Sequence, residues 1–166
     1  MDITLKKWDV GLKETLSDIC GKIDRAYLSD RLPDPYTEDD AAWFINMVSE
    51  HDGKDGVFRA VCADGRIIGN ISVEQKSDVY RKDGEIGYYL LPSFSSKGIM
   101  TEAVGRICEI AFSELDIVRI TGHVFAPNKA SARVLLKNGF LLEGTLKNAV
   151  FKNDKLYDLL IYGKVK

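Results

Sequence analysis

The chain has 166 residues, 45% of them hydrophobic, and a formal net charge of −2 from 23 basic and 25 acidic side chains. This length and apolar content suit one domain with a substantial core and are too small for two. The charge balance gives no global attraction to nucleic acid or to an anionic membrane, so a polyanionic ligand must be bound locally. We therefore expect a single domain over residues 1–166, with neither nucleic acid nor membrane as a partner.

The three cysteines, Cys20, Cys62 and Cys108, are far apart, odd in number and set among apolar residues. This pattern favours reduced core thiols in a cytoplasmic protein. Two histidines and the absence of a CxxC pair lead us to expect no metal site. The N-terminal residues lack the apolar segment of a signal peptide, and no run approaches the roughly 20 apolar residues of a membrane span.

The first part of the chain predicts a strand and two helices. Residues 3–8 alternate as a strand does, and residues 12–23 carry apolar positions at helical spacing. Two prolines then interrupt the chain within 31–36, a segment that is either a wall of a substrate site or a simple connector. Thr37 and Asp40 resemble a capping box, and the helix that follows would turn its apolar stripe inward, at Ala41, Phe44, Ile45 and Val48.

The middle of the chain predicts an antiparallel meander. Residues 57–63 and 66–75 read as strands joined at Asp64-Gly65, a dipeptide that suits a tight hairpin turn. A charged loop leads to a third strand at 85–91, which Pro92 ends.

A helix and a further strand follow. Apolar residues at three-four spacing predict a helix from Met100 to Leu115, and residues 118–125 alternate as a strand. A strand that returns through a helix beside its predecessor is parallel to it, so 85–91 and 118–125 should be a parallel pair. A short helix over 129–138, ended by Gly139, and a hairpin of strands 140–150 and 156–165 around 152–154 complete the chain.

The turn between the third strand and the long helix contains Ser95, Ser96, Lys97 and Gly98. Small residues that lead into a helix leave backbone N–H groups unpaired at the positive end of the helix dipole, which favours an anion. An ordinary strand–helix connection has the same appearance, and neither GxxxxGK[ST] nor an early GxGxxG is present.

Two segments carry a family resemblance: IGYYLLPSFSSKGIMTEA, residues 86–103, and NKASARVLLKNGFLLEG, residues 128–144. Together they closely resemble the GNAT acetyltransferase superfamily, in particular its ribosomal-protein N-terminal (RimJ/RimL-like) branch, and residues 31–41 are similar to that branch as well. The resemblance implies an α+β GNAT fold, with a mixed central sheet of about seven strands, flanking helices and a splayed parallel strand pair that holds acetyl-CoA.

The resemblance also implies the cofactor contacts. The backbone of Leu90 and Leu91 would pair with the pantetheine amides, while Asn128 and Ser131, which match the family's NxxS, would border the pantetheine and thiol end. The pyrophosphate would be held by Ser96, Lys97, Gly98, Ile99, Met100 and Thr101, in agreement with the anion site read from the residues.

The chain departs from the family pattern in two places. The loop [Q/R]xxGx[G/A] here reads 93–98 as SFSSKG, so its first residue is replaced and its first glycine is Ser96, for which a positive φ is costly. Many members place a tyrosine seven residues after the Asn, where this chain has Leu135. The loss is tolerable, because a thiol with a pKa of about 8.5 leaves readily as thiolate. Ser131 is the substitute we expect.

The general base is less well defined by sequence. Glu85 opens the strand beside the reaction gap, roughly where some family members carry a catalytic glutamate, although an exposed strand-end carboxylate looks the same. His123, on the facing strand, either relays a proton through water or is a half-buried structural histidine. The stripe Lys129, Arg133 and Lys137 either approaches the 3′-phosphate or is simply solvated.

The expected chemistry is direct attack of a neutral amine on the thioester, with the oxyanion held by a backbone N–H near Leu91. The acceptor we expect is a protein or peptide α-amine, entering between residues 31–36 and the turn at 152–154. The alternatives are a transferase for small amines, such as polyamines or amino-modified antibiotics, and a catalytically weak CoA-binding regulator. The sequence leaves open whether the protein is a monomer or a homodimer.

Overall fold

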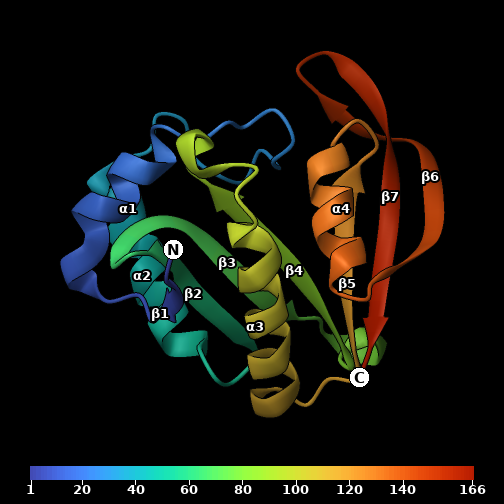
Figure 1. Cartoon of the computed structure of the whole chain (residues 1–166), viewed down its shortest axis with the longest axis horizontal. Coiled ribbons are helices and arrows are strands. Elements are labelled where there is room, and N and C mark those ends of the chain that lie inside the picture. Colours follow the sequence, from blue (N-terminus) through green and yellow to red (C-terminus); the bar gives the residue numbers. More distant parts are fainter.

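The computed structural model describes all 166 residues, and its centre is one sheet of seven strands (Figure 1). The strands lie in the order β1-β2-β3-β4-β5-β7-β6, and every neighbouring pair is antiparallel except β4 and β5. This confirms the mixed sheet, the meander and the parallel pair. The strands are β1 (Ile3–Lys6), β2 (Gly56–Ala63), β3 (Arg66–Gln75), β4 (Asp83–Leu90), β5 (Arg119–Phe125), β6 (Leu141–Lys152) and β7 (Lys155–Val165).

Four α-helices accompany the sheet: α1 (Lys13–Cys20), α2 (Glu38–His51), α3 (Ile99–Glu114) and α4 (Lys129–Lys137). The helix expected over 12–23 is shorter at both ends. A 3₁₀ turn at Val10–Leu12 precedes it, and the chain leaves the helix at Gly21. No helix has the length and apolar character needed to traverse a lipid bilayer.

The local signals at α2 are confirmed. Thr37 Oγ1 accepts a hydrogen bond from the Asp40 N–H at 3.2 Å, and Asp40 Oδ2 accepts one from the Thr37 N–H at 2.8 Å. Three members of the expected inward stripe are buried, whereas Phe44 is only half-buried because it lines a cavity.

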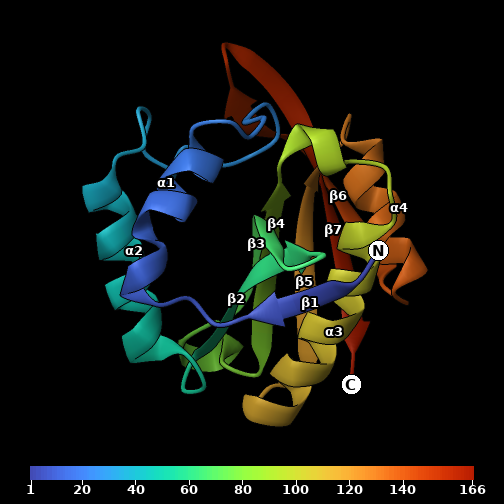
Figure 2. The ribbon, with the colours of Figure 1, turned by 60° about the vertical axis from the view of Figure 1, so that its left-hand side comes forward.

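The sheet separates two hydrophobic clusters. Along β2, Val57 and Val61 belong to a cluster of 26 residues with α3, while Phe58 and Ala60 belong to a cluster of 8 with α1 and α2. Side chains alternate between the faces of a strand, so a strand covered on both faces is apolar throughout. Figure 2 shows α1 and α2 on one side of the sheet and α3 on the other.

The parallel pair separates partway along its length. Pairing of β4 with β5 runs from Asp83 and Arg119 to Ile86 and Gly122 and then ends. Beyond that point β4 remains with β3 and β5 remains with β7, so the two strands diverge, as Figure 1 shows. This confirms the splayed pair, which places the candidate site in the gap between the two strands.

Candidate active site

Two adjoining cavities occupy this gap. We call the first, of about 530 Å³, the loop-side cavity, because residues 95–101 form one wall. The second, of about 770 Å³, is the sheet-side cavity, because β3, β4 and β5 contribute its floor. Six residues line both cavities and so mark their junction: Tyr27, Leu28, Tyr88, Tyr89, Asn128 and Ser131.

The loop-side cavity has the features of an anion site. Ser96 and Gly98 both have left-handed backbone, with φ of 60° and 77°, and α3 begins at Ile99 without a side-chain cap. The first N–H groups of α3 therefore lack helical partners at the positive end of the dipole. From the opposite wall α4 contributes Arg133 and Lys137, whereas Lys129 does not line the cavity.

All the cofactor residues expected from sequence line the loop-side cavity except Leu91. The Leu91 side chain is buried, and its N–H donates to the Ile68 carbonyl at 2.8 Å. The expectation that the Leu91 N–H holds the oxyanion is therefore wrong, because this N–H already donates a hydrogen bond within the sheet.

Strand geometry indicates which N–H groups of β4 face the gap instead. The Leu91 N–H donates to the Ile68 carbonyl of β3, and the Asp83 carbonyl accepts from the N–H of Lys76, which directly follows β3. The backbone groups of successive residues in a strand point to opposite neighbouring strands. The N–H groups of Tyr88 and Leu90 thus face β5, in the part of β4 where pairing with β5 has ended.

Helix α4 is fixed at both ends. Asn128 caps its start, with Oδ1 accepting from the Ser131 N–H at 3.2 Å. Gly139, with φ of 80°, follows its end, where the N–H groups of Gly139 and Phe140 bond to the carbonyls of Leu136 and Leu135. Sequence reasoning missed one positioning contact: Asn138 Nδ2 donates to the Thr101 carbonyl at 3.0 Å and ties α4 to the first turn of α3.

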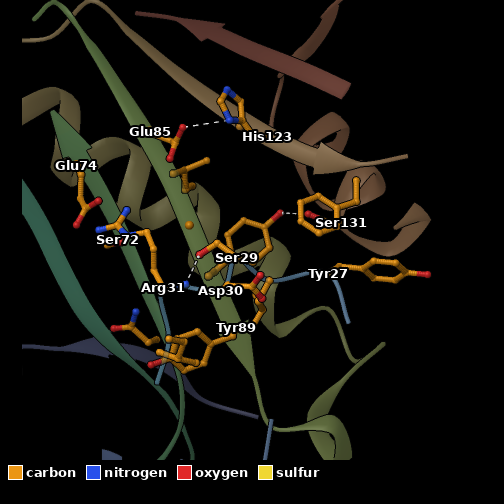
Figure 3. A pocket seen from close by; sticks show the side chains of 18 of the residues that line it. Tyr27, Ser29, Asp30, Arg31, Ser72, Glu74, Glu85, Tyr89, His123 and Ser131 are labelled. Atoms are coloured by element: carbon orange, nitrogen blue, oxygen red, sulfur yellow. Dashed lines mark hydrogen bonds and ion pairs between the residues drawn. The ribbon is translucent and has the colours of Figure 1, made fainter. Parts of the chain in front are cut away.

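Glu85 and His123 face the sheet-side cavity together. Glu85 Oε1 lies 3.2 Å from His123 Nδ1, and the two side chains are 42% and 39% exposed (Figure 3). The structure thus brings the expected base and the histidine of uncertain role into one pair. Glu74 lies directly across from Glu85 on β3 and lines the same cavity.

A hydroxyl pair lies at the junction of the cavities. Tyr88 Oη is 2.7 Å from Ser131 Oγ, and burial raises the pKa of the Tyr88 phenol to about 12. The sequence pointed to Ser131 but not to Tyr88. The available signal was the alternation of side chains between the two faces of β4, which puts Tyr88 on the opposite face from Glu85 and Tyr89. Leu135 is 1% exposed, and a Cβ on Gly122 would lie 2.7 Å from its Cδ1, so Leu135 fills the space above β5.

The segment containing the two prolines is a cavity wall as well as a connector. Arg31, Leu32, Pro33 and Tyr36 line the sheet-side cavity. Lys152, at the end of β6, closes the wall by an ion pair with Asp30, with Nζ 2.6 Å from Oδ1. The remainder of the turn, Asn153 and Asp154, lies outside the lining.

Comparisons with known proteins agree with this geometry. A family model described as an acetyltransferase (GNAT) domain matches residues 3–141. A putative ribosomal N-acetyltransferase, YdaF, of Bacillus subtilis is 33% identical over 67% of this chain and 60% of its own length. The ribosomal-protein-serine acetyltransferase of Escherichia coli is 33% identical over 60% of this chain and 55% of its own length.

These alignments thus span less than two thirds of those two relatives. Among solved structures, the ribosomal alpha-N-protein acetyltransferase RimL in complex with coenzyme A superposes with a TM-score of 0.85. It covers 98% of this chain and 93% of its own, at 22% identity, a level that supports the shared fold.

Proposed function

The chain belongs to the GNAT acetyltransferase family, and we propose that it transfers the acetyl group of acetyl-CoA directly to the α-amino group of a protein or peptide. One observation carries this proposal: a cavity bordered by the uncapped start of α3 and a second cavity with a carboxylate–imidazole pair meet in the gap between β4 and β5. Such an arrangement lets a thioester and an amine approach from opposite sides.

The loop-side cavity fits acetyl-CoA. Backbone N–H groups at the start of α3 would hold the pyrophosphate, Gly98 offers open space where a side chain would stand, and Arg133 and Lys137 supply positive charge. Acetyl-CoA supplies the acetyl group already activated as a thioester. The N–H groups of Tyr88 and Leu90 would take the pantetheine and oxyanion contacts that sequence placed partly at Leu91.

The chain's own groups would act mainly by alignment and charge. Glu85, with His123 beside it, would accept the proton that the amine loses, and an N–H of β4 that faces the gap would stabilise the carbonyl oxygen as negative charge develops. Ser131 lies near the place where the sulfur departs. No covalent intermediate on the protein is required.

An α-amine suits this site better than a lysine side chain. Its unperturbed pKa of about 7.7–8.0 leaves on the order of a tenth neutral at pH 7, against less than about one part in a thousand for lysine. Two relatives named above are, by their names, ribosomal-protein acetyltransferases, which points the same way. The wall of residues 31–36 would flank the entering peptide.

A small polyamine is the second candidate. Glu74 and Glu85, opposite one another on adjacent strands, place two carboxylates in one cavity, which favours an acceptor with a second positive charge. A weak CoA-binding regulator is the third, because Ser96 and Leu135 depart from the family pattern.

The test offers three acceptors at equal concentration: a peptide with a free N-terminus, its N-blocked twin that contains lysine, and spermidine. Release of free thiol from acetyl-CoA is measured. We expect the free N-terminus to be preferred. Preference for either other acceptor would replace the α-amine assignment, and no turnover with intact acetyl-CoA binding would favour the regulator.

A further inference from the structure

We propose that Tyr88 is a positioning residue for the transfer step: its phenol donates to Ser131 Oγ and so directs the Ser131 hydroxyl hydrogen at the departing sulfur. This inference rests on the proposed function and deepens it. Helix α4 has Leu135 at the position where many family members carry a tyrosine. In this chain the phenol comes from β4 instead.

The position of the pair supports this role. Tyr88 comes from β4 and Ser131 from α4, so their 2.7 Å contact crosses the gap where β4 and β5 have separated. Both residues line both cavities, which places the pair where the thioester and the amine would meet. In Figure 3 a dashed line joins Ser131 to the hydroxyl oxygen of an aromatic side chain in the cavity.

The direction of the hydrogen bond follows from the donors available. A phenol is a better donor than an aliphatic hydroxyl, and burial keeps Tyr88 protonated by raising its pKa to about 12. A serine hydroxyl has one hydrogen, so when Ser131 accepts from Tyr88 its own hydrogen points elsewhere. Its backbone N–H is already used by Asn128, which holds the residue in place. A chain of two hydroxyls polarises its terminal donor.

The hydroxyl pair donates hydrogen bonds and keeps its protons. The free thiol has a pKa of about 8.5, so the departing thiolate is too weak a base to deprotonate a phenol that holds its proton so tightly. In the step, the amine nitrogen bonds to the acetyl carbon, and the carbon–sulfur bond breaks with its electron pair left on sulfur. The amine proton goes to the Glu85–His123 pair, and the released thiolate takes a proton from water.

Leu135 explains why the donor comes from the strand. The Leu135 side chain is buried and packs against Gly122, so this position of α4 fills space in the core. Tyr88 reaches Ser131 from the facing side of the gap instead.

The most direct test uses coenzyme A alone and does not depend on the acceptor. A donor aimed at sulfur stabilises the thiolate, so bound coenzyme A should have a lower thiol pKa than free coenzyme A. Thiolate absorption is followed against pH for each protein, with desulfo-coenzyme A as the blank. We expect the lowered pKa in the wild type and its return toward the free value in Tyr88→Phe and Ser131→Ala.

Activity gives the second readout. We expect Tyr88→Phe to lower kcat about tenfold while the Kd for acetyl-CoA stays within about twofold, because the variant loses the one hydrogen bond that orients Ser131 toward the sulfur. The double variant with Ser131→Ala should be no slower than the slower single variant, because the two hydroxyls act as one unit.

Tyr162→Phe is the matched control. It removes a phenol from a buried tyrosine of β7 that lines neither cavity. The inference would be overturned by a coenzyme A thiol pKa in Tyr88→Phe equal to that in the wild type, by additive losses in the double variant, or by an equal loss in Tyr162→Phe. Failure of coenzyme A to bind the wild type would overturn the proposed function itself.

Discussion

Glu85 of β4 and His123 of β5 lie beside each other just where the two strands cease to pair, with Glu85 Oε1 3.2 Å from His123 Nδ1. The last parallel pair is Ile86 with Gly122, so the two side chains stand at the closed end of the gap. A proton acceptor at this place can reach an amine held in the sheet-side cavity.

We expect Glu85→Gln to lower kcat about a hundredfold, the range typical of a lost general base, with the Kd for acetyl-CoA unchanged. His123→Asn should have a smaller effect, because it removes the partner and leaves the carboxylate. Steady-state kinetics with calorimetric acetyl-CoA binding measures both. Wild-type turnover in Glu85→Gln would exclude this carboxylate as the base.

Acetyl-CoA should stabilise the fold. At a hundred times its Kd, a ligand that binds only the native state contributes about 2.7 kcal/mol, which corresponds to roughly 5–10 °C in Tm for a domain of this size. A thermal-shift titration measures this, with desulfo-coenzyme A expected to behave alike. An unchanged Tm at millimolar acetyl-CoA would contradict the cofactor assignment.

Gly98→Val should abolish acetyl-CoA binding. Gly98 has φ of 77° and borders the loop-side cavity, so a valine there projects into the space proposed for the pyrophosphate. Gly65→Val is the matched control, because Gly65 has φ of 79° and open surroundings in the hairpin turn between β2 and β3.

Both variants should lose about 1–3 kcal/mol of stability from backbone strain. Only the first should lose acetyl-CoA, as measured by calorimetry. Normal binding by a folded Gly98→Val protein would show that the turn does not hold the cofactor.

The three cysteines should be unreactive in the native protein. All three are buried and free, and burial raises their pKa values, that of Cys108 from about 9 to about 11. Alkylation by iodoacetamide at pH 8 should therefore be slow when the protein is folded and fast in urea. Rapid alkylation with loss of activity would support a thiol mechanism.

The raised pKa of Cys108 should make the free energy of unfolding depend on pH in the alkaline range. Between pH 9 and 11 the unfolded chain releases the Cys108 proton while the folded chain retains it, so the free energy of unfolding falls as pH rises. Urea titrations across this window should show the fall, and Cys108→Ala should flatten it. Equal slopes for both proteins would show that Cys108 does not contribute.

The sequence by itself determined the features that depend on neighbouring residues. The capping box of Thr37 and Asp40, the turn at Asp64-Gly65 and the left-handed Gly139 all follow from local backbone preferences. The meander, the parallel pair and the last hairpin were also predicted, because hydrophobic periodicity and connection length leave few arrangements for these strands. The residues expected to hold the pyrophosphate form a contiguous segment, 96–101, and all of them line the loop-side cavity.

Only the tertiary structure decided which groups meet and which are already paired. Leu91 was expected to offer a free N–H, but the register of β3 against β4 gives that group to Ile68. Tyr88 meets Ser131, 43 residues away, and Glu85 meets His123 across two strands. A shift of one residue in a strand exchanges the groups that face each neighbour. Which N–H groups stay free therefore depends on how β4 pairs with β3 and on where its pairing with β5 ends, and both become visible only in the folded sheet.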